Sequence, residues 1–303
     1  MTVAEATGGL SGPELIVMTE AEFASMREEQ GATVIERDGR YWEVPYPGFY
    51  QPIHLLARFR AAALAGFRTA AVWRPSLFCW GFRAALTDED AHLANGSIPV
   101  HLLVHVGQFT EGLNEGRRKD LRKCHRQVEL RRLRDPSLLL EQGYGVFRSA
   151  QLRVPYGRPL TQEEYLRRIE QRVLDQRRVF VAGLVDGRLA GYSDGYAVDG
   201  VLYLNQLFVR TELVHTGIAT GLYVEVIKIG ARTSTIHEVY CGAHLPEKPG
   251  ITAFKVSLGL TIVQVPARVA IPTPIDAYIK ARRPLAHYHL RGVKPGAAAA
   301  AQQ

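Results

Sequence analysis

The hydrophobic pattern is most regular in the middle of the chain. Apolar residues form three runs, at 179–185, 189–198 and 201–210, and the pairs Asp186-Gly187 and Asp199-Gly200 separate them. An Asp-Gly pair between two apolar runs is typical of a tight hairpin, because both turn residues adopt positive φ. The pattern therefore predicts an antiparallel meander of three strands.

Helical patterns flank this meander. Leu121, Cys124 and Val128 recur at helical spacing, which predicts a helix from about Glu111 to Gln127. Asp135-Pro136 predicts the start of a second helix that runs to about Leu152, and Thr161 with Glu164 predicts a capping box that opens a third helix, through Arg178. The later pattern predicts a helix at 217–232, a strand at 238–244, a helix at 251–258, a strand at 261–269 and a helix at 274–290. This order predicts an α/β (α+β) fold with a mixed, mostly antiparallel sheet flanked by helices.

The N-terminal part predicts a smaller α+β lobe over residues 13–96. Its aromatic residues Tyr41, Trp42, Tyr46, Phe49 and Tyr50 favour packing in a core, with an irregular substrate-binding loop as the alternative. Asp38-Gly39 predicts a hairpin. A turn at 94–97, followed by a strand from Pro99 to Val106, predicts that the main domain covers 97–291. Residues 1–12 and 292–303 are rich in small residues, glycine or proline, and are predicted to be flexible tails.

The composition indicates a basic protein and the kind of cellular compartment in which we expect it. The 303 residues include 37 Lys and Arg against 30 Asp and Glu, a net charge of +7 that suggests polyanionic partners. The three cysteines, Cys79, Cys124 and Cys241, are too few for a disulfide framework. Since no run approaches the ~18 to 20 apolar residues of a membrane span and no signal peptide is evident, we expect a soluble, cytoplasmic protein.

The net charge comes from one segment. Residues 117–134 contain nine Lys and Arg and two acids, which alone gives nine minus two, or +7. Arg118, Arg122 and His125 would share one face of a helix and could follow the phosphates of a polyanion such as tRNA. A solvated face that only keeps the protein soluble explains the pattern equally well.

The strand-to-helix junction that ends the meander is a candidate phosphate site. Gly217, Ala219 and Gly221 lie at the predicted start of a helix, where small residues let backbone N–H groups approach a phosphate. Close packing of the helix is the competing interpretation.

The order of elements from about residue 100 to 272 resembles the GNAT superfamily of acyltransferases. Gly217 and Ala219 match its pyrophosphate loop, whereas Val214 and His215 stand where Arg or Gln and glycine are usual. The resemblance implies an acyl-CoA donor, with an acyl carbonyl held by backbone groups of the third meander strand. The residues implied are Leu207 and Val209 for the acyl group, and Val214, His215, Thr216, Gly217, Ile218 and Ala219 for the donor phosphates.

A second resemblance covers the last third of the chain. Tyr240-Cys241-Gly242-Ala243-His244 and the run from Pro249 to Gly259, which contains Phe254-Lys255, look like the signature of the Fem-type branch. Fem enzymes transfer aminoacyl groups from tRNA to an amine of a peptidoglycan precursor, and related single-unit proteins are thought to use acyl-CoA. The resemblance implies Tyr240 near the substrate and Lys255 as a group that stabilises an oxyanion or a donor phosphate. A surface lysine on an amphipathic helix is the alternative.

A general base is harder to identify. The third meander strand carries Asn205 and Gln206, which can orient a substrate but cannot take a proton. His244 at a strand end is the best candidate, and a neutral amine could also react through positioning alone. His101 and His105 would lie about 13 Å apart on one strand, too far to share a metal.

These observations predict an N-acyltransferase that moves an acyl group from acyl-CoA to a primary amine, without a metal. The alternatives are an aminoacyl-tRNA-dependent transferase and a non-catalytic nucleic-acid-binding module.

Overall fold

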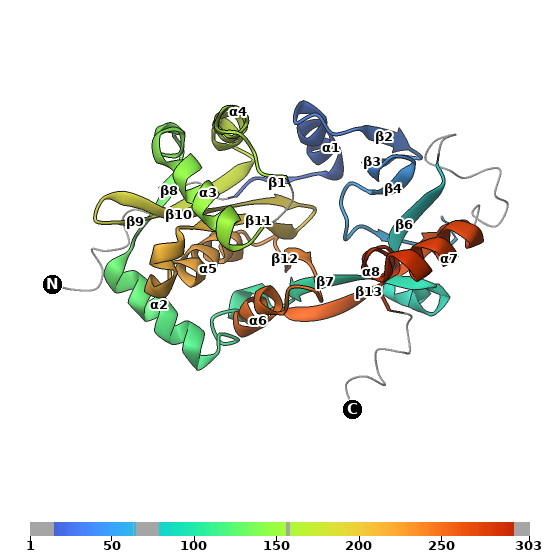
Figure 1. Cartoon of the computed structure of the whole chain (residues 1–303). Coiled ribbons are helices and arrows are strands. Elements are labelled where there is room, and N and C mark those ends of the chain that lie inside the picture. The colour runs from blue at the N-terminus through green and yellow to red at the C-terminus, as the bar shows by residue number, and fades with distance from the viewer. Residues whose placement is uncertain (1–14, 63, 65–78, 156–157, 294–303) are drawn as a thin grey trace. The chain divides into compact units, whose positions relative to one another are not determined.

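The computed structural model describes residues 15–62, 64, 79–155 and 158–293. It divides into two compact units. Unit 1 holds Leu102–Gly242 and Ala253–Thr261 with the described end of the first 17 residues, and unit 2 holds Met18–His101, Ala243–Thr252 and the chain from Ile262 onward. The helices (Figure 1) are α1 (Glu20–Glu29), α2 (Glu115–Gln127), α3 (Tyr144–Arg153), α4 (Gln162–Leu174), α5 (Ile218–Ala231), α6 (Pro249–Ser257), α7 (Thr273–Arg282) and α8 (Pro284–Arg291).

The sheet of unit 1 is built on the predicted meander. Its strands run in the spatial order β12-β11-β10-β9-β8, antiparallel except for the parallel pair β11 and β12. Asp186 and Asp199 have φ of 50° and 45°, and the glycine after each is also at positive φ, so both predicted hairpins are confirmed. The strands of this sheet are β8 (Glu129–Leu133), β9 (Arg178–Val185), β10 (Arg188–Val198), β11 (Val201–Val209) and β12 (Glu238–Ala243).

Alternate residues of the meander enter two hydrophobic cores. Val179, Val181 and Leu202 pack with the almost entirely apolar helix α5 on one face. Phe180, Ala182 and other residues of opposite parity pack with α3 and α4 on the other face. Figure 1 shows these two helices on the side of the sheet opposite α5. A period of two along each strand produces these two layers, because successive side chains point to opposite faces. The capping box predicted at Thr161 is present at the start of α4.

Unit 2 has a mixed sheet in the order β2-β3-β4-β6-β13-β7. Trp42, Phe49 and Tyr50 are buried there and help to fill a core, as favoured from the sequence, whereas Tyr46 is exposed. The hairpin at Asp38-Gly39 is confirmed by the register of β2 and β3. The remaining strands of the chain are β1 (Val17–Met18), β2 (Val34–Arg37), β3 (Arg40–Tyr46), β4 (Phe49–Pro52), β5 (Arg58–Phe59), β6 (Gly81–Leu86), β7 (Gly96–Leu103) and β13 (Thr261–Ala270).

The basic segment 117–134 is only partly helical, and the helix ends at Gln127, as predicted. Helix α2 starts at Glu115, where the side chain of Asn114 accepts a hydrogen bond from Arg117 N, and it ends at Gln127. Val128 is extended, and Glu129–Leu133 form β8, which pairs with β9. Pairing with a neighbouring strand outweighs the local preference of this arginine-rich run, since the pairing buries Leu130 against the α5 core.

Two further boundaries differ from expectation. The last helix is divided into α7 and α8, because Pro284 cannot continue a helix from the residues before it. Strand β7 runs over Gly96–Leu103, so His101 lies in the strand and His105 lies beyond it. The tails expected at 1–12 and 292–303 lie outside the described residues, apart from Gly292 and Val293.

Candidate active site

The parallel ladder between β11 and β12 is short. It joins Val201 to Glu238, Leu202 to Val239 and Tyr203 to Tyr240, although β11 continues to Val209 and β12 to Ala243. On its other side, β11 has a bulge, since Leu204 pairs with Gly195 while Gln206 pairs with Asp194, which leaves Asn205 extra. A bulge bends a strand and redirects a side chain. Beyond the Tyr203–Tyr240 pair, β11 and β12 are therefore free to interact with something other than each other.

Lys255 lies next to the β12 side of this opening. Its side chain is buried, with 9% of the residue exposed, so the alternative of a surface lysine is wrong. Its Nζ lies 3.4 Å from the position that a Cβ would take on Gly242, which has a φ of +81°. Burial lowers the pKa of Lys255, because desolvation disfavours the ammonium form. Leu258 is fully buried one turn later and anchors this end of α6 in the core of unit 1.

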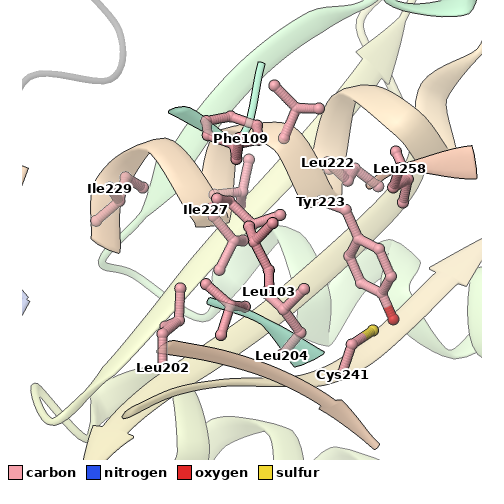
Figure 2. Close-up of a cluster of buried hydrophobic side chains, with 14 of the residues drawn as sticks. Leu103, Phe109, Leu202, Leu204, Leu222, Tyr223, Ile227, Ile229, Cys241 and Leu258 are labelled. Atoms are coloured by element: carbon pink, nitrogen blue, oxygen red, sulfur yellow. The ribbon is translucent and has the colours of Figure 1, made fainter. Parts of the chain in front are cut away.

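Two residues that the sequence analysis did not single out adjoin Lys255. Figure 2 shows the Tyr223 hydroxyl of α5 directed at the Cys241 sulfur of β12. The Tyr223 hydroxyl donates to that sulfur, and burial raises the pKa of both groups. The charge of Lys255 acts in the opposite direction on the Cys241 thiol and lowers its pKa. Tyr223 stands in an apolar run that is typical of a core helix, so only the fold reveals it.

Helix α2 covers the start of α5. Gly217 has a left-handed φ of +78°, and a Cβ on it would lie 2.3 Å from Asp120 O. Thr216, Gly217, Ile218 and Thr220 are all buried, while Ala219 is half-buried. Arg117 Nη1 donates to Asp120 Oδ2 at 2.8 Å and to Thr220 Oγ1 at 3.3 Å, and its guanidinium lies 5.0 Å from the centre of the Phe254 ring. Backbone atoms of α2 therefore lie directly against Gly217 at the start of α5.

The rest of the predicted donor loop is at the surface or engaged. Val214 and His215 are exposed in the short 3-10 helix over Thr211–Thr216, and His215 Nδ1 lies 2.8 Å from Glu212 O. On β11, Leu207 is half-buried, and Val209 O accepts a hydrogen bond from Arg153 Nη1 at 3.1 Å.

A buried ionic cluster supports the β11 bulge. Asp194 Oδ2 accepts hydrogen bonds from Arg172 Nη2 and Arg178 Nη1, each at 3.0 Å, and from Asn205 Nδ2 at 2.9 Å. Arg172 Nη1 also donates to Gln206 Oε1 at 2.8 Å. Asp194 is completely buried, and burial lowers the pKa of Arg178. Asn205 and Gln206 are predicted from the sequence, whereas Asp194, Arg172 and Arg178 are not, because each of these charged residues comes from a different element of the chain.

The comparisons with known proteins agree with this geometry. Residues 147–259 match the model of the acetyltransferase (GNAT) family. These residues form a GNAT acyltransferase domain. A search of curated proteins finds no match to the chain.

Solved structures with a similar fold extend over most of the chain. A FemX structure is similar with a TM-score of 0.58 and 10% identity, covering 91% of this chain and 96% of FemX. The C-terminal domain of a putative lysylphosphatidylglycerol synthetase from Agrobacterium fabrum has a TM-score of 0.55 and 9% identity, covering 90% and 98%. L-PGS from Bacillus licheniformis has a TM-score of 0.53 and 11% identity, covering 89% and 98%. The GNAT domain therefore belongs to a larger, Fem-like fold.

Two expected residues near the Fem-like signature lie differently. Tyr240 is half-buried in β12 of the GNAT domain, with its ring centre 4.9 Å from that of Tyr203. His244 falls in unit 2, whereas Lys255 falls in unit 1. His244 Nδ1 lies 2.7 Å from the Tyr288 hydroxyl, and its ring centre lies 5.5 Å from that of His101. His244 thus remains a prediction as a base.

The basic residues proposed on α2 share an exposed side of this helix in unit 1. Arg118, Arg122 and His125 are all exposed, as expected from their spacing. His125 Nε2 lies 4.0 Å from Glu225 Oε1 of α5, and Arg118 Nη2 donates to Glu111 O.

Two further searches concern metals and membranes. Within the described residues, no group of three or more His, Cys, Asp or Glu side chains is placed to bind a metal ion. Among the described helices, none has both the length and the hydropathy of a membrane span.

Proposed function

We propose that this protein transfers an acyl group from an activated donor to a primary amine by direct attack. The observation that carries the proposal is the early end of the β11–β12 ladder, with the buried Lys255 beside Gly242 at that point. Such an opening exposes backbone groups of β11, and those of Leu207 and Val209 would hold the acyl carbonyl. Asn205, Gln206 and Tyr240 would orient the acceptor.

The reaction is a nucleophilic acyl substitution. The amine nitrogen attacks the acyl carbon, a C–N bond forms, and the C–O or C–S bond to the donor breaks. The proton that the nitrogen loses ends on the leaving oxygen or sulfur. As an ammonium, Lys255 would stabilise the tetrahedral oxyanion, and its burial strengthens that interaction.

Two donor classes remain, and the covered start of α5 favours aminoacyl-tRNA over acyl-CoA. Gly217 packs against the backbone of α2, its N–H already donates to Val214 O at 3.3 Å, and Ile218 is buried, so a pyrophosphate would reach these N–H groups only after local rearrangement. The exposed cations Arg118, Arg122 and His125 offer an alternative site for phosphates. The Fem-type resemblance supports the same donor. In the acyl-CoA alternative, the donor phosphates would lie over the segment from Val214 to Ala219.

A donor assay tests the reaction and the donor together. The protein is incubated with acetyl-CoA or with a mixture of aminoacylated tRNAs, together with a panel of primary amines, and amide products are detected by mass spectrometry. We expect amide from aminoacyl-tRNA that disappears in Lys255→Met. Product from acetyl-CoA alone would refute the tRNA donor but keep the reaction class, and product from neither donor would refute the proposal.

A matched pair of variants tests the phosphate surface. Replacing Arg118 and Arg122 by alanine should weaken tRNA binding and lower the slope of log K against log salt by roughly 1.5 to 2. The control replaces Arg167 and Arg168, which are exposed on α4 and carry the same charge. Equal effects of the two double variants would show that only net charge matters.

His244→Gln tests the predicted base. If His244 takes the proton of the amine, kcat should fall by roughly a hundredfold. An unchanged kcat would mean that positioning of the amine, and not proton removal by His244, accounts for the rate.

A further inference from the structure

The buried cluster under the β11 bulge fixes which atoms Asn205 and Gln206 turn outward. A carboxylate can only accept hydrogen bonds and a guanidinium can only donate them. Asn205 must therefore direct its NH₂ group at Asp194, as the 2.9 Å and 3.2 Å contacts from Nδ2 show. Gln206 must direct its Oε1 at Arg172. Their free ends are then an oxygen on Asn205 and an NH₂ group on Gln206.

Asn205 presents this oxygen at the opening of the ladder. The residue is exposed and lies two positions beyond Tyr203, the last β11 residue that pairs with β12. Among the described residues, Asn205 Oδ1 makes no hydrogen bond, although the NH₂ group of the same side chain is engaged. An acyl carbonyl or an oxyanion is itself an acceptor and would be repelled there. Only a ligand group with an N–H or O–H fits.

The charge of the cluster selects further among such groups. Arg172 and Arg178 contribute two positive charges and Asp194 one negative charge. Asp175 also acts on Arg178, but it is paired with Arg177 at 2.7 Å and that pair adds no net charge, so the cluster holds two minus one, or +1. The Asp194 and Arg178 side chains are 0% and 2% exposed, so water screens this charge poorly. A net positive charge beneath Asn205 disfavours an ammonium group and favours a neutral amine.

From this arrangement we propose that Asn205 Oδ1 receives an N–H of the acceptor amine in its neutral, nucleophilic form, and that Asp194 and Arg172 are positioning residues for this contact. The inference rests on the proposed acyl transfer and specifies its acceptor site. It assigns no proton transfer to Asn205, since an amide oxygen is not a base at neutral pH.

Two substitutions separate the contact from the charge. Asn205→Ala removes the acceptor oxygen and should raise KM for the amine about tenfold, while KM for the donor stays constant. Arg172→Gln keeps Asn205 and a hydrogen-bond donor but brings the cluster to one minus one, or zero, and so favours the ammonium form. The rise of kcat/KM with pH should then move upward by roughly one pH unit in this variant alone.

Controls make these outcomes decisive. Gln162→Ala removes an exposed amide at the start of α4 and should change neither parameter. Circular dichroism and unfolding curves establish that each variant is folded. An unchanged amine KM in Asn205→Ala, or a pH profile of Arg172→Gln identical to that of the wild type, would overturn the inference.

A binding experiment separates this inference from the proposed function. If the wild-type protein transfers no acyl group from either donor, the proposed function fails, and amine binding then decides the inference. In ¹⁵N-labelled protein, the Gln206 side-chain NH₂ signal is followed during titration with 2,2,2-trifluoroethylamine at about pH 7, where this weakly basic amine is neutral and side-chain amide protons exchange slowly enough to be observed. A saturable shift in the wild type that is lost in Asn205→Ala supports the contact, and a shift that is absent or equal in both proteins overturns it.

Discussion

Gly217→Ala tests whether α2 is packed on the start of α5. The added methyl group meets two costs. The φ of +78° places an alanine in the left-handed region, at a cost of about 1 to 2 kcal/mol. The new Cβ would also lie 2.3 Å from Asp120 O and 2.8 Å from Asp120 C. These are backbone atoms, so no change of rotamer relieves the contact and α2 must shift.

The expected magnitude follows from the sum of these terms. Overpacking costs about 1 to 3 kcal/mol where the neighbour has to move. Together with the strain, Gly217→Ala should destabilise the protein by roughly 2 to 5 kcal/mol. That is a large fraction of the stability of a typical domain, about 5 to 15 kcal/mol.

Gly187→Ala is the matched control. Gly187 has a similar φ of +73°, but no atom lies within 4 Å of the position of its Cβ, so only the strain applies. Urea unfolding followed by circular dichroism measures both variants, and we expect Gly217→Ala to cost at least about 1 kcal/mol more. Hydrogen exchange should also increase in α2 for Gly217→Ala only. Equal costs would refute the packing of α2 on Gly217, and with it the reason for preferring tRNA over acyl-CoA.

Three further predictions concern buried groups of unit 1. A Cβ on Gly221 would lie 2.3 Å from Cys124 Sγ but 3.3 Å from Cys124 Cβ. Cys124→Ala should therefore recover most of the roughly 1 to 3 kcal/mol lost in Gly221→Ala. Additive costs of the two substitutions in a double-mutant cycle would contradict this. Burial lowers the pKa of Lys255, so below that pKa its buried charge opposes folding. Lys255→Met should therefore raise the stability at neutral pH by roughly 0.5 to 2 kcal/mol while abolishing transfer. A variant that is less stable in urea would argue against this prediction. Burial raises the pKa of the Cys124 thiol from 9.0 to about 12, so the unfolded chain loses this proton first and stability should fall between these values by at most about 1.4 kcal/mol per pH unit. Unfolding curves at about pH 8 and about pH 10, with Cys124→Ala as the variant that lacks this slope, check the last prediction.

Local signals in the sequence predicted much of the architecture. The Asp-Gly pairs at 38, 186 and 199 each form the expected turn, because their positive φ values are a property of the two residues themselves. Thr161 and Glu164 form the expected capping box for the same reason. The meander and the helix order that resembles the GNAT fold follow from these signals together with the apolar runs.

Local signals in the sequence were insufficient where the structure of a segment depends on a partner far away in the chain. Residues 129–133 form a strand because they pair with the edge of β9, and their own sequence, with two arginines among five residues, does not predict a strand. Lys255 is buried because of what surrounds α6, although its own sequence position is compatible with the surface. A lysine and its neighbours along a helix do not reveal which strand that helix will meet.

The sequence by itself thus determined the turns, the helix starts, the meander and the concentration of basic charge, and it proposed Asn205 and Gln206 as substrate-binding residues. Only the tertiary structure decided that α2 covers Gly217, that Lys255 adjoins Cys241 and Gly242, and that Asp194 with two arginines orients Asn205. The physical reason is the separation along the chain over which each interaction acts. Turn and cap energies depend on residues within about four positions of each other, whereas burial and charge at the site depend on contacts between strands and helices far apart in the chain.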